Sequence, residues 1–180
     1  MSQFAKTFLS LTAFFIVAFV FLGFFLPKED KIIVSKKIKC SPNHTYTMIN
    51  DLKNWDKWNP WDSYDPNMKK VYGDISVGKG AWYTWEGNSQ VGKGKLSIEN
   101  TVENQRVDML LSISDYRTNQ CGFVITPVEN GSNVDWYMNM SYSENSIVKN
   151  ILGGYSYLIM KYFLTNDFNK GLTNLNNTCN

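Results

Sequence analysis

Residues that commonly build catalytic and metal sites are scarce in this sequence. It has one histidine, His44, and three cysteines, Cys40, Cys121 and Cys179. A Ser/His/Asp or Cys/His catalytic site would have to use His44, yet this residue falls in the first turn of an expected helix and should lie at the surface. The cysteines have no ligand spacing such as CxxC, so we expect neither a metal nor a cofactor. One pair could form a disulfide in an oxidising compartment, but we expect three unpaired thiols.

An excess of charge of either sign is also missing. The 18 Lys and Arg residues nearly balance the 16 Asp and Glu residues, for a net charge of +2, which argues against a nucleic-acid partner. With 43% hydrophobic and 19% charged residues, the composition excludes a wholly disordered chain. The length of 180 residues suffices for about one ordinary domain.

Hydrophobicity is concentrated at the N-terminus, where residues 8–26 form a run of 19 residues without a charge. As a helix this run would cover about 28 Å, close to the hydrocarbon thickness of a bilayer. A cleavable signal peptide has an apolar core of only about 7–15 residues and ends at small residues, whereas this run ends in bulky ones. We therefore expect a single-pass, uncleaved membrane anchor over residues 1–26, a linker over 27–32 and a folded domain over 33–180.

The lysines that flank the apolar run bear on the side of the membrane on which this domain lies. Before the apolar run stand only Lys6 and the α-amino group. The lysines that follow it within a short distance are Lys28, Lys31, Lys36, Lys37 and Lys39. The positive-inside rule therefore slightly favours a cytoplasmic domain. Three of the five lysines belong to an expected strand, which weakens the count, so the side is left open.

A strand over residues 33–40 and a short helix open the folded domain. Ser41 can cap the helix, and Pro42 fits its first position. The apolar residues that recur at helical spacing and predict its buried face are Met48, Ile49 and Leu52. We expect the helix to end near Asn54 and a loop to follow over residues 55–66.

Six strand-like segments come next. Their ranges are 69–75, 81–86, 94–102, 107–113, 123–125 and 134–142. In the last, apolar residues from Val134 to Tyr142 alternate with polar neighbours such as Tyr137 and Ser143, so one face should be buried and the other polar. Asp108 and Asp135 fall on such polar faces and should face solvent. The Asn-Gly-Ser sequence at 130–132 marks the turn before the last strand.

A long helix over residues 154–176 ends the chain. Its expected buried face consists of Leu158, Tyr162, Phe168, Leu172 and Leu175. Gly171 interrupts this helix at a cost of about 1 kcal/mol relative to Ala; it either allows a close approach to the sheet or a ligand, or is tolerated without a role. Consecutive strands with few helices between them predict an α+β fold. We expect a curved antiparallel sheet of about six to seven strands around the C-terminal helix, with room for a cavity between them.

Several motifs occur in an order and spacing that carry a family resemblance. They are Ser41-Pro42 after the first strand, INDLKNWDKWNPW at 49–61, Gly78-Lys79-Gly80-Ala81 before Trp85-Glu86-Gly87, Gly92-Lys93-Gly94, and FNKGLTNL at 168–175. With these the chain resembles the SRPBCC superfamily of START-like and Bet v 1-like helix-grip proteins, and within it the polyketide cyclase/dehydrase-like branch. The resemblance covers nearly all of residues 27–180. It implies a helix-grip fold with a hydrophobic cavity, and members of one bacterial subgroup also begin with a single apolar segment.

Alternation along the strand 81–86 predicts which side chains reach that cavity. Tyr83 and Trp85 share one face, and Trp82 and Glu86 share the other. We expect the first pair to face the cavity, because the opposite register would bury Glu86 without a partner and would make it an acid/base candidate with a raised pKa. The expected cavity lining is Tyr83, Trp85, Met109, Leu111, Trp136, Met138 and Gly171.

The sequence GNSQVGKG at 87–94 nearly matches a phosphate-binding loop. It lacks the final Ser or Thr that contacts the metal, since this position is Gly94. Strands also flank it, whereas a phosphate-binding loop opens a helix. We therefore expect the glycines to form a hairpin.

The sequence leaves three functions open. The first is a membrane-anchored domain that binds a lipid-like or other apolar small molecule. The second is a polyketide cyclase-like or dehydratase-like enzyme, which needs a polar acid/base pair facing the cavity. The third is a structural or sensory membrane protein whose cavity is filled by side chains. The SRPBCC superfamily includes lipid carriers, hormone receptors and cyclases, so the resemblance does not decide among them, and neither the ligand nor the oligomeric state follows from the sequence.

Overall fold

The computed structural model describes residues 2–26, 29–114, 117–141 and 146–179. The chain divides into two compact units. The helical unit comprises residues 1–30 and 141–162, and the sheet unit comprises residues 31–140 and 163–180. Residues 27–28 of the expected linker, and Tyr142 and Ser143 at the end of the expected alternation, lie outside the described residues.

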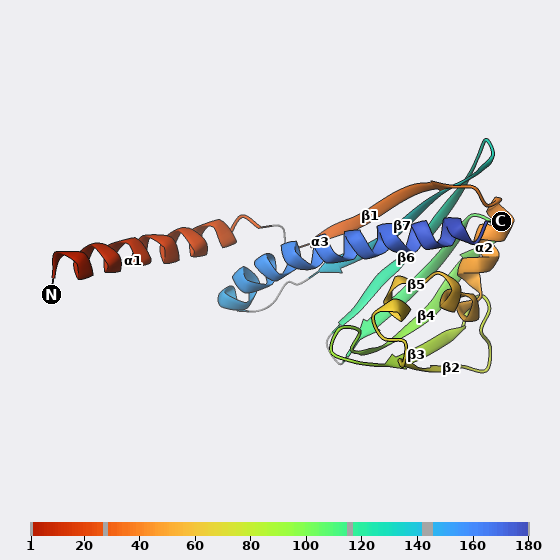
Figure 1. Cartoon of the computed structure of the whole chain (residues 1–180), viewed down its shortest axis with the longest axis horizontal. Coiled ribbons are helices and arrows are strands. Elements are labelled where there is room, and N and C mark those ends of the chain that lie inside the picture. The colour runs from red at the N-terminus through yellow and green to blue at the C-terminus, as the bar shows by residue number, and fades with distance from the viewer. Residues whose placement is uncertain (1, 27–28, 115–116, 142–145, 180) are drawn as a thin grey trace. The chain divides into compact units, whose positions relative to one another are not determined.

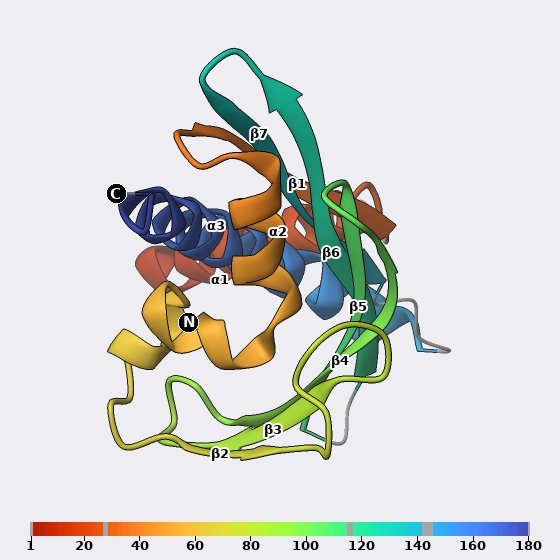
Figure 2. The same cartoon turned by 90° about the vertical axis from the view of Figure 1, so that its right-hand side faces the viewer.

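A seven-stranded antiparallel sheet dominates the sheet unit, with the strand order β1-β7-β6-β5-β4-β3-β2 (Figure 1). The strands are β1 (Glu29–Ile38), β2 (Lys69–Tyr72), β3 (Trp82–Glu86), β4 (Lys93–Val102), β5 (Arg106–Ile113), β6 (Arg117–Val128) and β7 (Gly131–Ser141). A register shift in β4 between Ile98 and Asn100 marks a bulge, which bends a strand and increases its twist. The sheet curves around the C-terminal half of α3 (Ile147–Asn177), as Figure 2 shows. The predicted α+β helix-grip fold is therefore confirmed.

The first helix of the sheet unit begins as predicted and ends earlier. In α2 (Pro42–Asn50), the backbone N–H of His44 donates to the Ser41 hydroxyl at 3.3 Å. The helix stops at Asn50 rather than near Asn54, because Asp51 adopts an extended conformation and accepts a hydrogen bond from the N–H of Lys53. The expected loop over 55–66 instead contains the end of one 3-10 helix, η1 (Leu52–Lys57), and a second, η2 (Pro60–Ser63).

An aromatic cluster fills the space between the sheet and α3. The indole N–H groups of Trp55 and Trp58 donate to backbone carbonyls of α2, at 2.9 and 3.1 Å, so both rings can be buried without an unpaired donor. Trp136 of β7 lies face to face with Phe168 of α3, with ring centroids 4.2 Å apart. The cluster therefore joins η1, the sheet and the helix in one core.

The C-terminal half of α3 contributes to this core. Phe168, Leu172 and Leu175 are fully buried, as the helical spacing predicts. The prediction is wrong for Leu158 and Tyr162, which are 44% and 67% exposed, because both belong to the helical unit and not to the sheet unit. The helix also begins at Ile147, before the expected residue 154.

Gly171 allows α3 to pack closely against the core. A Cβ atom at this position would stand 2.6 Å from Cζ3 of Trp136 and 3.1 Å from Cδ of Pro60. Real Cβ atoms do not approach a buried ring so closely without displacing it. Of the two roles that the sequence left open, close packing is the one observed.

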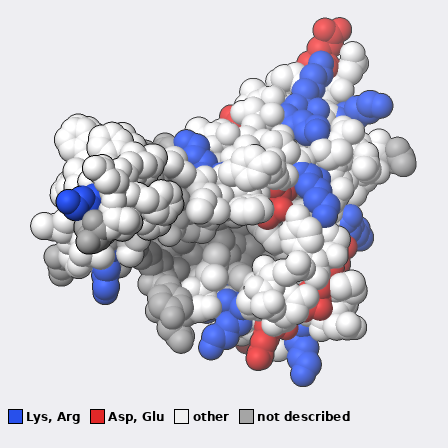
Figure 3. All heavy atoms as spheres, turned by 60° about the vertical axis from the view of Figure 1, so that its left-hand side comes forward, with Lys and Arg blue, Asp and Glu red and all other residues white. Residues whose placement is uncertain are grey.

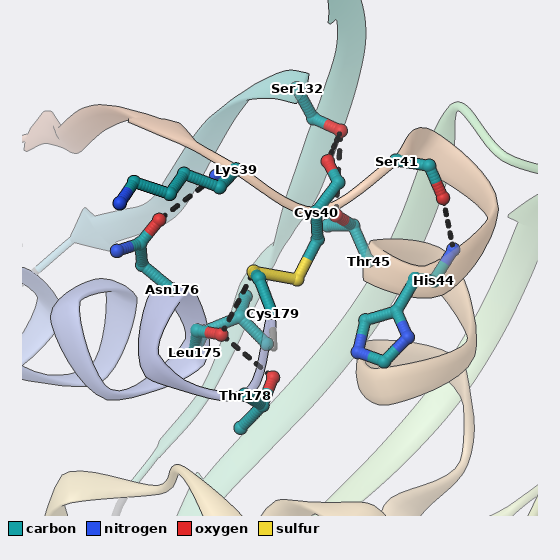
Figure 4. The surroundings of a disulfide bond; sticks show 10 residues. All are labelled: Lys39, Cys40, Ser41, His44, Thr45, Ser132, Leu175, Asn176, Thr178 and Cys179. Atoms are coloured by element: carbon teal, nitrogen blue, oxygen red, sulfur yellow. Dashed lines mark hydrogen bonds between the residues drawn. A yellow bond between two sulfur atoms is a disulfide. The ribbon is translucent and has the colours of Figure 1, made fainter. Parts of the chain in front are cut away.

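The expectation of three unpaired thiols is wrong. Cys40, at the end of β1, forms a disulfide with Cys179, at the end of α3, with their Cα atoms 4.9 Å apart (Figure 4). The two residues are 139 positions apart in sequence, and only the curvature of the sheet around α3 brings them together. Cys121 of β6 is buried and has a free thiol.

The polar face of the central strands is less exposed than the alternation predicts. Tyr137 of β7 is only 6% exposed, because its hydroxyl donates to the carboxylate of Asp108 on β5 and the ammonium of Lys31 lies 4.6 Å from its ring centroid. Arg106 also donates to Asp108, at 2.7 Å. Asp108 and Asp135 are half-buried rather than fully solvent-facing, and the chain has a hydrogen-bonded cluster on this outer face.

The helical unit contains α1 (Gln3–Gly23), whose 21 residues rise about 31 Å along the helix axis. Its apolar side chains are exposed over almost the whole length. The helix is long and apolar enough to cross a membrane, a property that membrane anchors share with signal sequences.

Candidate ligand pocket

A mostly apolar pocket lies on the concave side of the sheet, between β3, β5 and the C-terminal half of α3. Its lining residues are Asn59, Trp61, Met68, Tyr83, Trp85, Gln90, Val91, Leu111, Ile113 and Leu164. The cavity volume is about 200 Å³. An apolar cavity of about 150 Å³ can hold benzene, whereas pockets for drug-sized ligands span about 300–1,000 Å³. The pocket therefore has room for a ligand about the size of one aromatic ring, or for one end of a larger molecule.

The register of β3 brings two aromatic side chains into this pocket. Tyr83 and Trp85 both line it, and Glu86 is exposed on the other face. This is the register that the sequence predicts, and it keeps the Glu86 carboxylate out of the core. The hairpin between β3 and β4 is also as predicted, with the N–H of Gly87 donating to the carbonyl of Gly92 at 2.9 Å. Its glycines serve the turn, and β3 and β4 flank it.

Hydrogen bonds hold the aromatic walls of the pocket in place. The indole N–H of Trp85 donates to the carbonyl of Val91 at 3.0 Å. Asp167 of α3 accepts from the indole N–H of Trp61 at 3.0 Å and from the hydroxyl of Tyr64 at 2.6 Å. The hydrogen bond to Asp167 raises the pKa of Tyr64 to about 12, with burial adding to the effect. These contacts fix the η2 segment against α3, and with it one wall of the pocket.

Uncharged polar groups supply the pocket with its hydrogen-bonding chemistry. Asn59 is 6% exposed, and among the described residues its side-chain oxygen has no hydrogen-bond partner. Burial raises the pKa of Tyr83 far above its ordinary value, and the nearby Asp62 adds to this shift. The Tyr83 phenol therefore stays protonated at neutral pH and can donate a hydrogen bond.

A charged cluster stands beside these polar groups, outside the pocket lining. The ammonium of Lys70 lies 2.6 Å from Asp56 and 2.7 Å from Asp62. Burial raises the pKa of Asp62, although its hydrogen bond and charge interaction with Lys70 oppose the shift. One cation faces two carboxylates, so the cluster carries one negative charge in excess when both carboxylates are ionised.

Three of the seven residues expected at the cavity line the pocket, namely Tyr83, Trp85 and Leu111. The other four are buried in the core outside the lining of this pocket: Met109, Trp136, Met138 and Gly171. At two of these positions, Trp136 and Gly171, the aromatic cluster occupies the space where a ligand was expected. Sequence reasoning missed Leu164, although it lies four residues before Phe168 and seven before Gly171 on the buried face of α3. It also missed Ile113, which continues the alternation through Leu111.

Other candidate sites have weaker support. His44 is exposed, as the sequence predicts. Within the described residues, no group of three or more His, Cys, Asp or Glu side chains could hold a metal ion. Two more open hollows lie elsewhere on the surface, one of them over the outer face of β2 to β5. On the face drawn in Figure 3, side chains of both signs are interspersed, in keeping with the small net charge.

Comparisons with known proteins identify the fold. By sequence, no family model and no curated protein matches the chain. Among solved structures, the KanY protein superposes with a TM-score of 0.61 at 15% identity, over 84% of this chain and 97% of KanY. A Staphylococcus aureus protein of unknown function gives 0.60 at 13% identity, over 83% of this chain and 95% of its own. The Thermus thermophilus protein TTHA0849 superposes with a TM-score of 0.59 at 15% identity, over 82% of this chain and 95% of its own.

Proposed function

We propose that this chain is a membrane-anchored member of the SRPBCC superfamily whose sheet unit binds an apolar small molecule. The observation that carries the proposal is the pocket beside Tyr83, Trp85 and Leu164, which has apolar walls and a few polar groups. Such a combination is typical of small-molecule sites, where apolar surface supplies affinity and polar groups orient the ligand. The helix-grip fold and the sequence motifs at 49–61 and 168–175 support the family.

The polar groups indicate which ligand would fit. Asn59 offers an acceptor oxygen and Tyr83 a donor hydroxyl, and neither carries a charge at neutral pH. A ligand that combines an aromatic or aliphatic body with one hydroxyl, amide or carbonyl group would satisfy both. The volume of about 200 Å³ limits the enclosed part to about one ring and its substituent.

Binding is better supported than proton-transfer catalysis. A cyclase or dehydratase would need an acid/base pair facing the cavity. The described lining residues include no carboxylate and no imidazole, and burial holds the Tyr83 phenol in its protonated form. Asp62 is paired with Lys70, and both lie beside the pocket rather than in its lining.

For the membrane topology, we propose that α1 is retained as an anchor and that the sheet unit lies outside the cytoplasm. The Cys40–Cys179 disulfide supports this side, because disulfides persist in oxidising compartments and are rare in the cytosol. The lysines after residue 26 favour the other side only slightly, and Lys36 and Lys37 belong to β1. A folded strand is not the short juxtamembrane loop to which the charge rule applies.

The ligand proposal predicts that filling the pocket weakens binding. In Leu164→Trp the larger side chain occupies the cavity, and the affinity for p-cresol, a soluble ring-sized probe with one hydroxyl, should fall at least about tenfold, since each 1.4 kcal/mol of lost apolar contact is a factor of ten. Saturation-transfer NMR on the full chain in lipid nanodiscs measures the loss. Val71→Trp is the matched control, because Val71 is exposed on the outer face of β2. Equal binding by both variants would contradict the site.

A further inference from the structure

The first half of α3 presents an apolar stripe to its surroundings. Val148, Leu152 and Ile159 are each more than half exposed. Their spacing of four and then seven residues places them along one side of the helix. The helices of soluble proteins bury such a stripe against the core, and a contiguous exposed apolar surface marks a protein or membrane contact.

The same side of this helix half also packs against the C-terminal end of α1, through Tyr155, which lies between Leu152 and Ile159 along the stripe. Tyr155 stacks on Phe19 with ring centroids 4.1 Å apart, and its hydroxyl donates to the backbone carbonyl of Phe19 at 2.7 Å. Gly23 lies directly against Ile151, since a Cβ on this glycine would stand 2.5 Å from Cγ2 of Ile151. The helical unit therefore joins the end of the long apolar helix to the beginning of α3.

Continuity with α1 identifies what covers the stripe. The apolar side chains of α1 are exposed, as expected of a helix surrounded by lipid, and the stripe of α3 lies beside the end of that helix. Lys149 is exposed next to Val148. A lysine at this position can extend its ammonium toward lipid phosphates while its alkyl chain stays in apolar surroundings.

We propose that the first half of α3 lies in the lipid interface next to α1, with Val148, Leu152 and Ile159 in contact with acyl chains. The inference rests on the proposed membrane anchoring of α1. Interfacial helices bury their apolar face about 5–10 Å into the boundary between headgroups and acyl chains. This arrangement places the start of α3 at the membrane surface.

Depth-dependent fluorescence quenching tests the contact. The full chain carries an environment-sensitive nitrobenzoxadiazole label at Leu152→Cys, in vesicles of phosphatidylcholine and phosphatidylglycerol in equal amounts. Labelling is carried out without reductant, so that the disulfide stays intact, and Cys121 is protected because its thiol is buried. The wild-type chain measures the background labelling. Two control variants carry the same label, one at Thr12→Cys within α1 and one at Glu103→Cys. Glu103 is exposed in the turn between β4 and β5.

The expected result is quenching at Leu152 by a nitroxide near the lipid headgroup, weaker quenching there by a nitroxide near the acyl-chain end, and little at Glu103. Thr12 should respond most to the deep nitroxide. An unquenched Leu152 beside a quenched Thr12 overturns the inference and leaves the anchor standing, whereas an unquenched Thr12 removes the anchor itself. Equal quenching at Leu152 and Glu103 also overturns the inference. A quenching signal at Leu152 that changes with the protein-to-lipid ratio overturns it as well, because such a change indicates that chains associate with one another.

Discussion

Replacing Cys179 by alanine is expected to lower the free energy of unfolding by about 4 kcal/mol. The disulfide closes a loop between residues 139 positions apart, and chain-entropy arithmetic for loops above about 100 residues gives roughly 4–5 kcal/mol. It joins the segment just after β1 to the end of α3, so that its loss releases the C-terminal end of the helix from the sheet. Denaturant unfolding of the full chain in detergent, followed by tryptophan fluorescence, measures the change.

Reductant supplies the control for this variant. Reducing agent should destabilise the wild-type chain by the same amount and leave Cys179→Ala unchanged. Three free thiols per native chain under oxidising conditions, with a wild-type stability that does not respond to reductant, would contradict the disulfide. The same outcome would remove the support for a sheet unit outside the cytoplasm, because that argument depends on the Cys40–Cys179 bond.

Trp136→Ala is expected to cost about 3–5 kcal/mol, the range measured for truncating a large buried aromatic residue. Its ring stacks on Phe168, and α3 approaches it through Gly171. Truncation leaves a cavity that neither neighbour can fill without moving the helix. The unfolding assay used for the disulfide measures the loss.

Trp82→Ala is the matched control for this prediction. Trp82 is half-buried on the outer face of β3 with the ammonium of Lys95 4.8 Å from its ring centroid, a contact worth about 0.5–1 kcal/mol at exposed sites. We expect a much smaller loss of stability than for Trp136→Ala. Equal losses for the two variants would show that the aromatic cluster is not the core of the sheet unit.

The strand register could be predicted from the sequence because it depends on local alternation. Tyr83 and Trp85 line the pocket and Glu86 is exposed because side chains on a strand alternate between its faces. The start of α2 was equally predictable, since a serine followed by a proline is a local signal that the structure uses directly.

Features that depend on long-range packing could not be predicted in the same way. Met109, Trp136 and Met138 are buried, as alternation requires, but Trp55 and Trp58 pack against the ring of Trp136 where a ligand was expected. The spacing of apolar residues in α3 does not reveal where one compact unit ends and the other begins, so Leu158 and Tyr162 were assigned to the core. The pairing of Cys40 with Cys179 depends on how the segment after β1 meets the end of α3 in space, which no local pattern records.

The central proposal for this protein is that its pocket holds an apolar small molecule. Native mass spectrometry of the full chain, extracted from its membrane in mild detergent, tests this claim directly. The wild-type chain and Val71→Trp should each retain an additional bound mass that Leu164→Trp lacks. Chains that all emerge without a bound molecule, or that all retain it equally, would contradict the claim.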